Sequence, residues 1–340
     1  MDEYIFSPLE WEEKAKKEDK TFFCKIRDYE SSQGSLKSFI KQEYTRQITS
    51  YKGIENQILL NALQEIPGKT NLSMCAAKWS KYRQIYSFDK FLLDYLLENV
   101  NIDSINANMM IYKLPFPAFY VKNIINIGNY CVEGFYVYLN KCNENNIITL
   151  EVNLVCHKNN KDNALFFESF TTYLAKDGEY SISEGIKKQT ADDDRGKTLE
   201  QVLQAAIILI TYLCTDKVDV VRRKEEYTPR NSKNKKPKKA DLKLVGAKTA
   251  RVIKERKTRY VYEDSKEVTG DRKGKPKAAH FRSAHYHSFW TGKRDEPEKR
   301  QLIVKLLDPI FVNGNNKEIP VTERKVVNEG RTHKTERNTI

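Results

Sequence analysis

The spacing of apolar residues divides the chain into a helical N-terminal part and a strand-rich middle part. Between Ser38 and Asn99 apolar residues recur every three to four positions, which is the period of an amphipathic helix. From Leu114 onward, aromatic and β-branched residues dominate and the polar separators are short. This pattern predicts β-strands at residues 119–121, 134–139, 147–156 and 166–174.

The connections between these strands indicate how they pair. Asn143–Asn146 is a polar turn, too short for a crossover helix, so we expect an antiparallel sheet. The apolar segment Leu199–Cys214 follows Thr198 and Gln201, whose spacing is typical of a capping box, and should form a helix packed on that sheet. The predicted fold class is α+β, with a helical region at 1–110 and a sheet-plus-helix core at 111–216.

The C-terminal third has a different composition. Arg222–Ala240 contains two prolines and nine basic residues but no aliphatic side chain larger than alanine. Such a segment buries too little apolar surface to offset the entropy lost on ordering. We therefore expect a basic, partly disordered linker at 217–278 with short strands near 242–245 and 259–262. A segment rich in histidine and aromatic residues should follow at 279–316, and a flexible tail at 317–340.

The overall composition is that of a chain able to form a core, with 39% hydrophobic residues. Its longest apolar run, Ala205–Cys214, is about half of the ~20 residues that a membrane helix needs. The acidic start Met1-Asp2-Glu3 lacks a following apolar segment, so no secretory signal is predicted. The six cysteines form no C-x-x-C pair, which favours reduced thiols. We expect a cytoplasmic protein with no membrane attachment and no cofactor.

Charge is distributed unevenly along the chain. Residues 217–340 contain 34 Lys+Arg and 17 Asp+Glu, a net charge of +17, whereas residues 1–216 have a net charge of −4. A basic third joined to a near-neutral body indicates a polyanionic partner such as RNA, although a solvated tail that serves only solubility has the same composition. The candidate nucleic-acid contacts are Arg222, Arg223, Lys235, Lys236, Lys238 and Lys239.

Three histidines within eight residues, His280, His285 and His287, form the most unusual cluster in the chain. On an extended strand His285 and His287 share one face, and two imidazoles at this spacing can bind a metal when a third ligand comes from elsewhere. Histidines can also act as general acid and base in RNA cleavage. No second cluster has ligand spacing, and we interpret Asp192–Asp194 as a solvated loop, so no metal site is predicted.

Alternation would place Arg282, Tyr286 and Trp290 on the face opposite His285, His287 and Phe289. A guanidinium group beside aromatic rings can stack single-stranded bases or hold a peptide, and the same residues are equally typical of core packing. The candidate binding residues are Arg282, Tyr286, Phe289 and Trp290.

The end of the chain resembles a type V-A anti-CRISPR family that lowers production of the effector nuclease. The family pattern is H-x-R-x-G-H-W-H-x-Y-W-x-G, a charged turn, a basic strand and P-x-F-V-N. It is matched here by His280, Arg282, His285, His287, Trp290, Gly292, Pro309, Phe311, Val312 and Asn313. The chain departs from the pattern at Ala284, Tyr286 and Phe289, which replace glycine, tryptophan and tyrosine.

This resemblance implies a protein of a phage, plasmid or other mobile element. It also implies that the protein recognises the N-terminal polypeptide of the effector during synthesis and that the translated messenger is then lost. A non-enzymatic binding protein acting on a nascent polypeptide, an mRNA or both is therefore expected. The alternatives are an RNA endonuclease using His280, His285 and His287, or a basic nucleic-acid-binding regulatory protein. The oligomeric state is not predicted.

Overall fold

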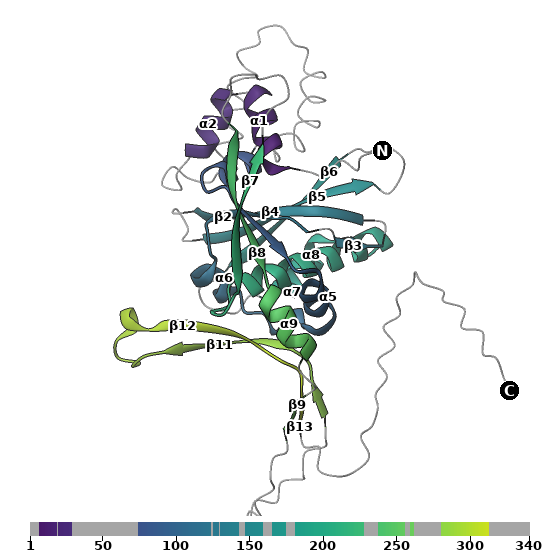
Figure 1. Cartoon of the computed structure of the whole chain (residues 1–340), viewed down its shortest axis with the longest axis vertical. Coiled ribbons are helices and arrows are strands. Elements are labelled where there is room, and N and C mark those ends of the chain that lie inside the picture. Colours follow the sequence, from purple (N-terminus) through teal and green to yellow (C-terminus); the bar gives the residue numbers. More distant parts are fainter. Residues whose placement is uncertain are drawn as a thin grey trace, which may run out of the picture. The chain divides into compact units, whose positions relative to one another are not determined.

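The computed structural model of this chain is shown in Figure 1. It forms two compact units, Met1–Lys257 with Ser283–Asp308, and Thr258–Arg282 with Pro309–Ile340. The described residues are 7–18, 20–28, 74–123, 125–128, 130–142, 147–158, 165–174, 181–227, 237–255, 259–261 and 280–312. Of the stretch Ser38–Asn99 that is expected to be helical, residues 38–73 lie outside these ranges.

The first unit is built on an eight-stranded sheet with the order β6-β5-β4-β2-β1-β8-β7, in which β3 pairs with β4. Its strands β2 to β6 pair antiparallel through short connections, so the predicted meander is confirmed. The bounds are β2 Ala118–Val121, β3 Ile125–Ile127, β4 Tyr130–Cys142, β5 Ile147–Lys158 and β6 Leu165–Leu174.

The sheet as a whole is mixed, because β1 (Gln84–Phe88) runs parallel to both β2 and β8. The prediction of a purely antiparallel sheet is therefore corrected to this extent. Strand β1 was hidden within a stretch expected to be helical, since its two faces are both buried and it shows no apolar-polar alternation. A crossover through α5 (Lys90–Asn99), the 3₁₀ turn Ile102–Ser104 and α6 (Ala107–Lys113) returns the chain to β2.

Helices cover the two faces of this sheet. Tyr86, Phe119 and Phe135 point into one core, shared with α5, α6, α7 (Ile182–Gln189) and α8 (Asp194–Leu213). Ile85 and Tyr136 point into the other core, shared with α1 (Pro8–Glu18), α2 (Lys20–Asp28) and helical residues 74–80. This layered packing confirms the α+β class and the apolar helix on the sheet.

Helix α8 begins four residues before the predicted capping box. Asp193 is the N-cap, and its side chain accepts a hydrogen bond from the Gly196 N–H. Thr198 lies within the first turns and donates to the Asp194 carbonyl oxygen. A carboxylate at the N-cap satisfies a backbone donor and favours the helix dipole, so the aspartate run has a structural role.

The basic segment that was expected to be a linker forms two strands of the sheet. Strand β7 (Val220–Tyr227) pairs antiparallel with β8 (Lys238–Val245), and β8 pairs with β1. The linker prediction is therefore wrong for these residues, because main-chain pairing with a buried neighbour supplies the stabilisation that their side chains lack. Lys235 and Lys236 lie outside the described residues.

The predicted C-terminal segment 279–316 is divided between the two units. In the first unit, β11 (His285–Thr291) and β12 (Gln301–Leu307) form an antiparallel hairpin, and α9 (Ala247–Glu255) precedes it in sequence. In the second unit, β10 (His280–Arg282) and β9 (Arg259–Val261) flank β13 (Ile310–Val312). Strands β12 and β13 are separated by Asp308 and Pro309 and belong to different sheets.

Asp216 connects the β11–β12 hairpin to the rest of the first unit through hydrogen bonds. Its Oδ2 accepts a 2.6 Å hydrogen bond from the Val304 N–H, and its own N–H donates to the Val304 carbonyl oxygen at 3.0 Å. Lys113 contacts its Oδ1 at 2.7 Å. Burial opposes ionisation, but these hydrogen bonds prevail and lower the pKa of Asp216.

The described cysteines Cys24, Cys75, Cys131, Cys156 and Cys214 are free thiols. Burial raises the pKa of Cys75 well above its usual value, which keeps this thiol protonated. None of the described helices combines the length and apolar character needed to cross a membrane.

Candidate nucleic-acid interface

The three clustered histidines are distributed over two strands. His280 and the exposed Arg282 lie on β10 in the second unit, whereas His285 and His287 lie on β11 in the first. The Nδ1 atom of His285 is 3.1 Å from the Ser283 carbonyl oxygen, which fixes this imidazole locally. Across the part of the chain that the structure describes, no three His, Cys, Asp or Glu side chains are grouped to hold a metal. Neither unit alone assembles the three-histidine catalytic site.

The two faces of β11 differ in burial. Tyr286 is 3% exposed and donates a hydrogen bond from its hydroxyl to the Ile208 carbonyl oxygen at 3.0 Å. Burial raises the pKa of Tyr286 well above its usual value. The prediction of Tyr286 as a ligand contact is corrected, because packing on α8 occupies its ring and hydroxyl. Ala284, two residues before Tyr286, is also buried, and it does not adopt the positive φ that glycine favours.

The far end of the hairpin exposes aromatic rings next to cations. Trp290 and Phe289 are 43% and 36% exposed. The Trp290 ring meets Tyr112 of α6 edge-on, with centroids 5.4 Å apart, and the Arg300 guanidinium lies 5.7 Å from the Trp290 centroid. Lys305 lies 5.3 Å from the Phe289 centroid. This aromatic tip (Tyr112, Phe289, Trp290) suits stacking with a base or an aromatic side chain.

A second candidate surface is an open pocket beside strands β1, β7 and β8. Its cavity volume is about 580 Å³, within the range of small-ligand sites. We call it the basic pocket, because four of the residues that line it are cationic and one is acidic. It is lined by Gln84, Phe116, Arg222, Arg223, Lys224, Asp241 and Lys243.

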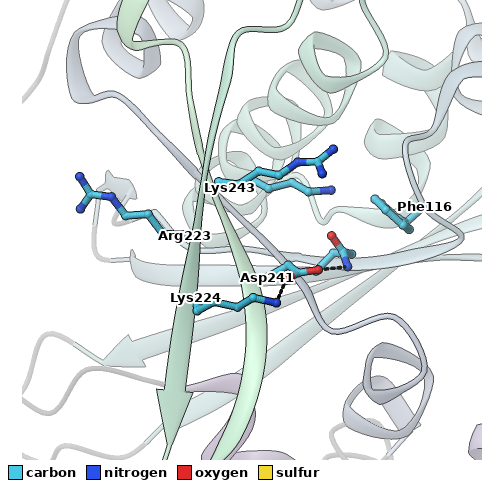
Figure 2. A pocket seen from close by; sticks show the side chains of 7 residues that line it. Phe116, Arg223, Lys224, Asp241 and Lys243 are labelled. Carbon is cyan, nitrogen blue, oxygen red and sulfur yellow. Dashed lines mark hydrogen bonds and ion pairs between the residues drawn. The ribbon is translucent and has the colours of Figure 1, made fainter.

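Strand register explains how the basic pocket is formed. Arg222 lies opposite Lys243, and Lys224 lies opposite Asp241, so these four side chains share one face of the β7–β8 pair. Arg223 occupies the alternate position, and Figure 2 shows its guanidinium directed to the other side of the strand. Arg223 therefore borders the basic pocket without pointing into it.

Lys243 is the central cation of the basic pocket and is only 8% exposed. Its Nζ lies 3.1 Å from the Tyr86 hydroxyl and 4.1 Å from the Phe116 ring centroid, and Figure 2 shows it extending toward Phe116. Burial lowers the pKa of Lys243, and the nearby Arg222 lowers it further while Asp241 opposes both effects. The charged amine is thus held by a hydroxyl and two aromatic faces.

Asp241 is already engaged by neutral and cationic neighbours. Its Oδ1 accepts a hydrogen bond from Lys224 at 2.8 Å, and its Oδ2 accepts one from the Gln84 amide at 3.3 Å. The Lys224 hydrogen bond holds the pKa of Asp241 below its usual value. Within the described ranges, Arg222, Arg223 and Lys243 have no ion pair with a carboxylate, so their charge is directed to the pocket and its rim.

Two of the predicted nucleic-acid contacts are neutralised by ion pairs within the first unit. Lys239 contacts Glu226 at 2.8 Å, and Lys238 contacts Glu13 of α1 at 2.5 Å. Their expected role is therefore corrected, because their charge is balanced inside the protein. Arg222 and Arg223 retain free charge on an exposed strand.

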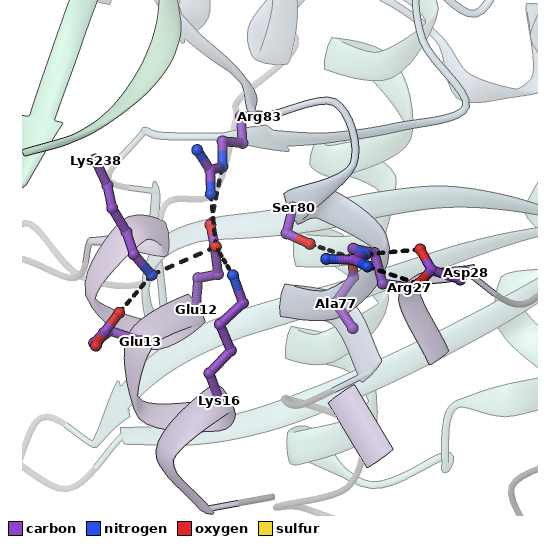
Figure 3. Close-up of polar contacts among 9 residues, drawn as sticks. All are labelled: Glu12, Glu13, Lys16, Arg27, Asp28, Ala77, Ser80, Arg83 and Lys238. Carbon is purple, nitrogen blue, oxygen red and sulfur yellow. Dashed lines mark hydrogen bonds and ion pairs between the residues drawn. The ribbon is translucent and has the colours of Figure 1, made fainter. Parts of the chain in front are cut away.

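Lys238 belongs to a larger cluster around a buried carboxylate, shown in Figure 3. Glu12 is fully buried and contacts Lys16 at 2.6 Å, Arg83 at 2.8 Å and Lys238 at 3.5 Å. Burial alone would raise the pKa of Glu12, but the hydrogen bonds from Lys16 and Arg83 outweigh it and lower the pKa. Arg83 has a φ of 48°, a left-handed conformation that costs energy for a non-glycine residue. This cluster joins α1 to the sheet.

Three lining residues of the basic pocket, Gln84, Phe116 and Lys243, are not among the site residues predicted from the sequence. Lys243 alternates with apolar residues in Leu242–Val245, and such a lysine normally points to solvent. A lysine inside an otherwise apolar strand could have indicated a site residue. Lys243 is buried because β8 pairs with β1, and this pairing of distant segments cannot be predicted from the alternation of residues in β8.

Comparisons with known proteins agree with the resemblance noted in the sequence. A family model described as the anti-CRISPR type V subtype A2 family, AcrVA2-like, matches residues 86–314. Among solved structures, one titled as the crystal structure of AcrVA2 is similar, with 15% sequence identity and a TM-score of 0.44. That match covers 91% of this chain and 100% of the other. No curated protein matches the chain.

Proposed function

Because the chain belongs to the anti-CRISPR type V subtype A2 family, we propose that it inhibits a CRISPR effector by lowering the production of that effector. It would bind the N-terminal polypeptide of the effector as the ribosome makes it and promote loss of the messenger being translated. This action takes place in the bacterial cytoplasm and needs no cofactor.

The observation that carries the RNA part of this proposal is the charge on strand β7. Arg222 and Arg223 are exposed on the edge strand of the sheet, and no described carboxylate pairs with either. Unpaired cations on a rigid strand can neutralise phosphates and release their counterions. The aromatic tip supports the polypeptide part, since exposed aromatic rings beside cations suit peptide side chains as well as bases.

A reporter experiment tests the polypeptide part. A reporter carrying the N-terminal codons of a type V-A effector is expressed with and without the protein, next to a synonymous-codon copy and a frameshifted copy. We expect the mRNA level to fall for the first two and to stay unchanged for the frameshifted copy. Equal mRNA levels for all three in the presence and absence of the protein would reject the proposal.

A binding experiment tests the RNA part. The double variant Arg222→Gln/Arg223→Gln should weaken RNA binding and reduce the slope of log K against log salt by roughly 0.7 for each lost phosphate contact. The matched control is Lys239→Gln, which removes the same kind of charge from a residue already paired with Glu226. An identical salt slope for wild type and the double variant would remove β7 from the interface.

A further inference from the structure

The basic pocket contains a buried cation that lacks an anion. Lysines as buried as Lys243 are normally paired with a carboxylate, because an uncompensated charge loses its hydration. Within the described ranges, Asp241 is the acidic residue of the pocket, and its two oxygens are hydrogen-bonded to Lys224 and Gln84. A buried ammonium group facing an open cavity of about 580 Å³ indicates that an external anion completes the arrangement.

A second polar atom of the basic pocket is also unsatisfied. Gln84 is 7% exposed, and its Oε1 has no hydrogen-bond partner among the described residues. Its amide nitrogen donates to the Tyr82 carbonyl oxygen at 2.8 Å, which fixes the amide. A ligand that supplies an N–H or O–H donor would satisfy this acceptor, which an anion without such a donor, such as chloride or sulfate, cannot do.

The remaining features of the pocket fit a nucleotide. Phe116 lines the pocket, and because Lys243 covers one face of its ring, a base can contact this ring edge-on. With Lys224 balanced by Asp241, Arg222 and Lys243 contribute two positive charges on one face of the β7–β8 pair. A phosphate monoester carries about −1.5 to −2 charges at neutral pH, which matches these two cations better than a carboxylate does.

We propose that the basic pocket binds a nucleotide, with its phosphate held by Arg222 and Lys243, its base against Phe116, and a donor on the base or ribose satisfying Gln84. The nucleotide is either free or the terminal residue of an RNA. The inference deepens the RNA contact of the proposed function and, for the RNA source, rests on it.

Isothermal titration calorimetry of the full chain at low salt tests the site directly. The probes are 5′-AMP, adenosine and inorganic phosphate. We expect 5′-AMP to bind about tenfold or more tightly than either fragment, because it alone makes the charged contacts and the base contacts together. Binding of 5′-AMP no tighter than adenosine would overturn the proposal. Tighter binding of a glutamate-rich peptide than of 5′-AMP, with displacement of the nucleotide, would also overturn it.

Variants locate the binding within the pocket. Arg222→Gln and Lys243→Met should each weaken 5′-AMP binding by about tenfold. Lys239→Gln is the matched control, since it removes one positive charge from the same strand pair at a residue that is paired with Glu226 and does not line the pocket, and it should change affinity by about twofold or less. Equal losses for Arg222→Gln and Lys239→Gln would overturn the proposal. Because Arg222 is exposed, Arg222→Gln should fold normally. The test can therefore be made even if Lys243→Met does not fold.

Competition distinguishes the two sources of the nucleotide. Displacement of 5′-AMP by a short single-stranded RNA with a 5′-phosphate, and not by its 5′-hydroxyl copy, supports the RNA end. Failure of both RNAs to displace bound 5′-AMP supports the free nucleotide. The titration uses purified protein and does not depend on translation. Unchanged reporter mRNA would therefore reject the proposed function without rejecting the nucleotide site. Absence of 5′-AMP binding in the titration would reject the nucleotide site without rejecting the proposed function.

Discussion

Two antiparallel strand pairs from the basic third of the chain, β7–β8 and β11–β12, use their cations in different ways. In β7–β8 the cations either pair with carboxylates, as Lys239 does, or line an open pocket, as Lys243 does. In β11–β12 the cations Arg300 and Lys305 lie next to exposed aromatic rings. The comparison shows that net charge alone does not define a binding surface, because the neighbours of each cation decide whether its charge is available.

The two pairs also differ in how they are anchored. The β11–β12 hairpin buries one face, with Tyr286, Leu302 and Val304 in the core of the first unit. Strand β7 is largely exposed, and the pair is held through β8 by β1 and by the Glu12 cluster. The hairpin thus combines a buried apolar face with the Asp216 hydrogen bonds, whereas the β7–β8 pair depends more on the buried Glu12 carboxylate.

Removing the apolar anchor should have the largest effect. Tyr286→Ala is expected to lower the free energy of unfolding by about 3–5 kcal/mol, because it leaves a cavity against α8 and removes the hydrogen bond to the Ile208 carbonyl oxygen. Urea unfolding followed by circular dichroism measures this loss. Phe289→Ala, an aromatic truncation on the exposed face of the same strand, should cost less than about 1 kcal/mol. Equal losses would contradict the assigned burial.

Removing the charged anchor should come next. Glu12→Gln is expected to cost about 2–4 kcal/mol at neutral pH, since it leaves Lys16, Arg83 and Lys238 without their buried anion. The measurement is urea unfolding as a function of pH.

The pH dependence sharpens this prediction. The folded-state pKa of Glu12 is below the ordinary value of 4.5, so its stabilisation is present above about pH 4.5 and is lost as the pH falls through the folded-state pKa. The difference between wild type and Glu12→Gln should therefore shrink in acid. A difference that stays constant down to about pH 2 would contradict this electrostatic origin.

The aromatic tip should contribute an intermediate amount to binding and little to folding. Trp290→Ala is expected to weaken binding of single-stranded RNA by about 1–2 kcal/mol, through the loss of one stacking surface. Fluorescence anisotropy with labelled RNA measures this change. Trp290→Phe should restore part of the affinity, and an unchanged affinity for both variants would assign the aromatic tip to the polypeptide instead.

The smallest effect should come from the balanced pair on β7–β8. Lys239→Gln removes one partner of an exposed ion pair with Glu226, which typically contributes between 0 and about 1 kcal/mol. We expect a change in unfolding free energy of about 0.5 kcal/mol or less. A larger loss would show that the β7–β8 pair depends on its surface charges more than on β1.

Much of the fold could be predicted because the responsible signals are local. Strands β4 and β5 are rich in aromatic and β-branched residues and are separated by a short polar segment, and α8 carries a long apolar segment. Strand β1 was not predicted, because it is five residues long and buried on both faces and so shows no alternation of apolar and polar residues. Arg222 and Arg223 are predicted from their charge as nucleic-acid contacts in a linker, whereas the structure places them on β7 beside the basic pocket.

Residues close together in the chain are enough to predict the meander, the apolar helix, the uneven charge and the family motif. Which cations are available and which histidines share a unit depends on contacts between residues far apart in the chain. Lys243 meets Tyr86 across 157 positions, and Lys238 meets Glu13 of the first helix. Burial and ion pairing at such separations depend on strand order, which no local pattern encodes.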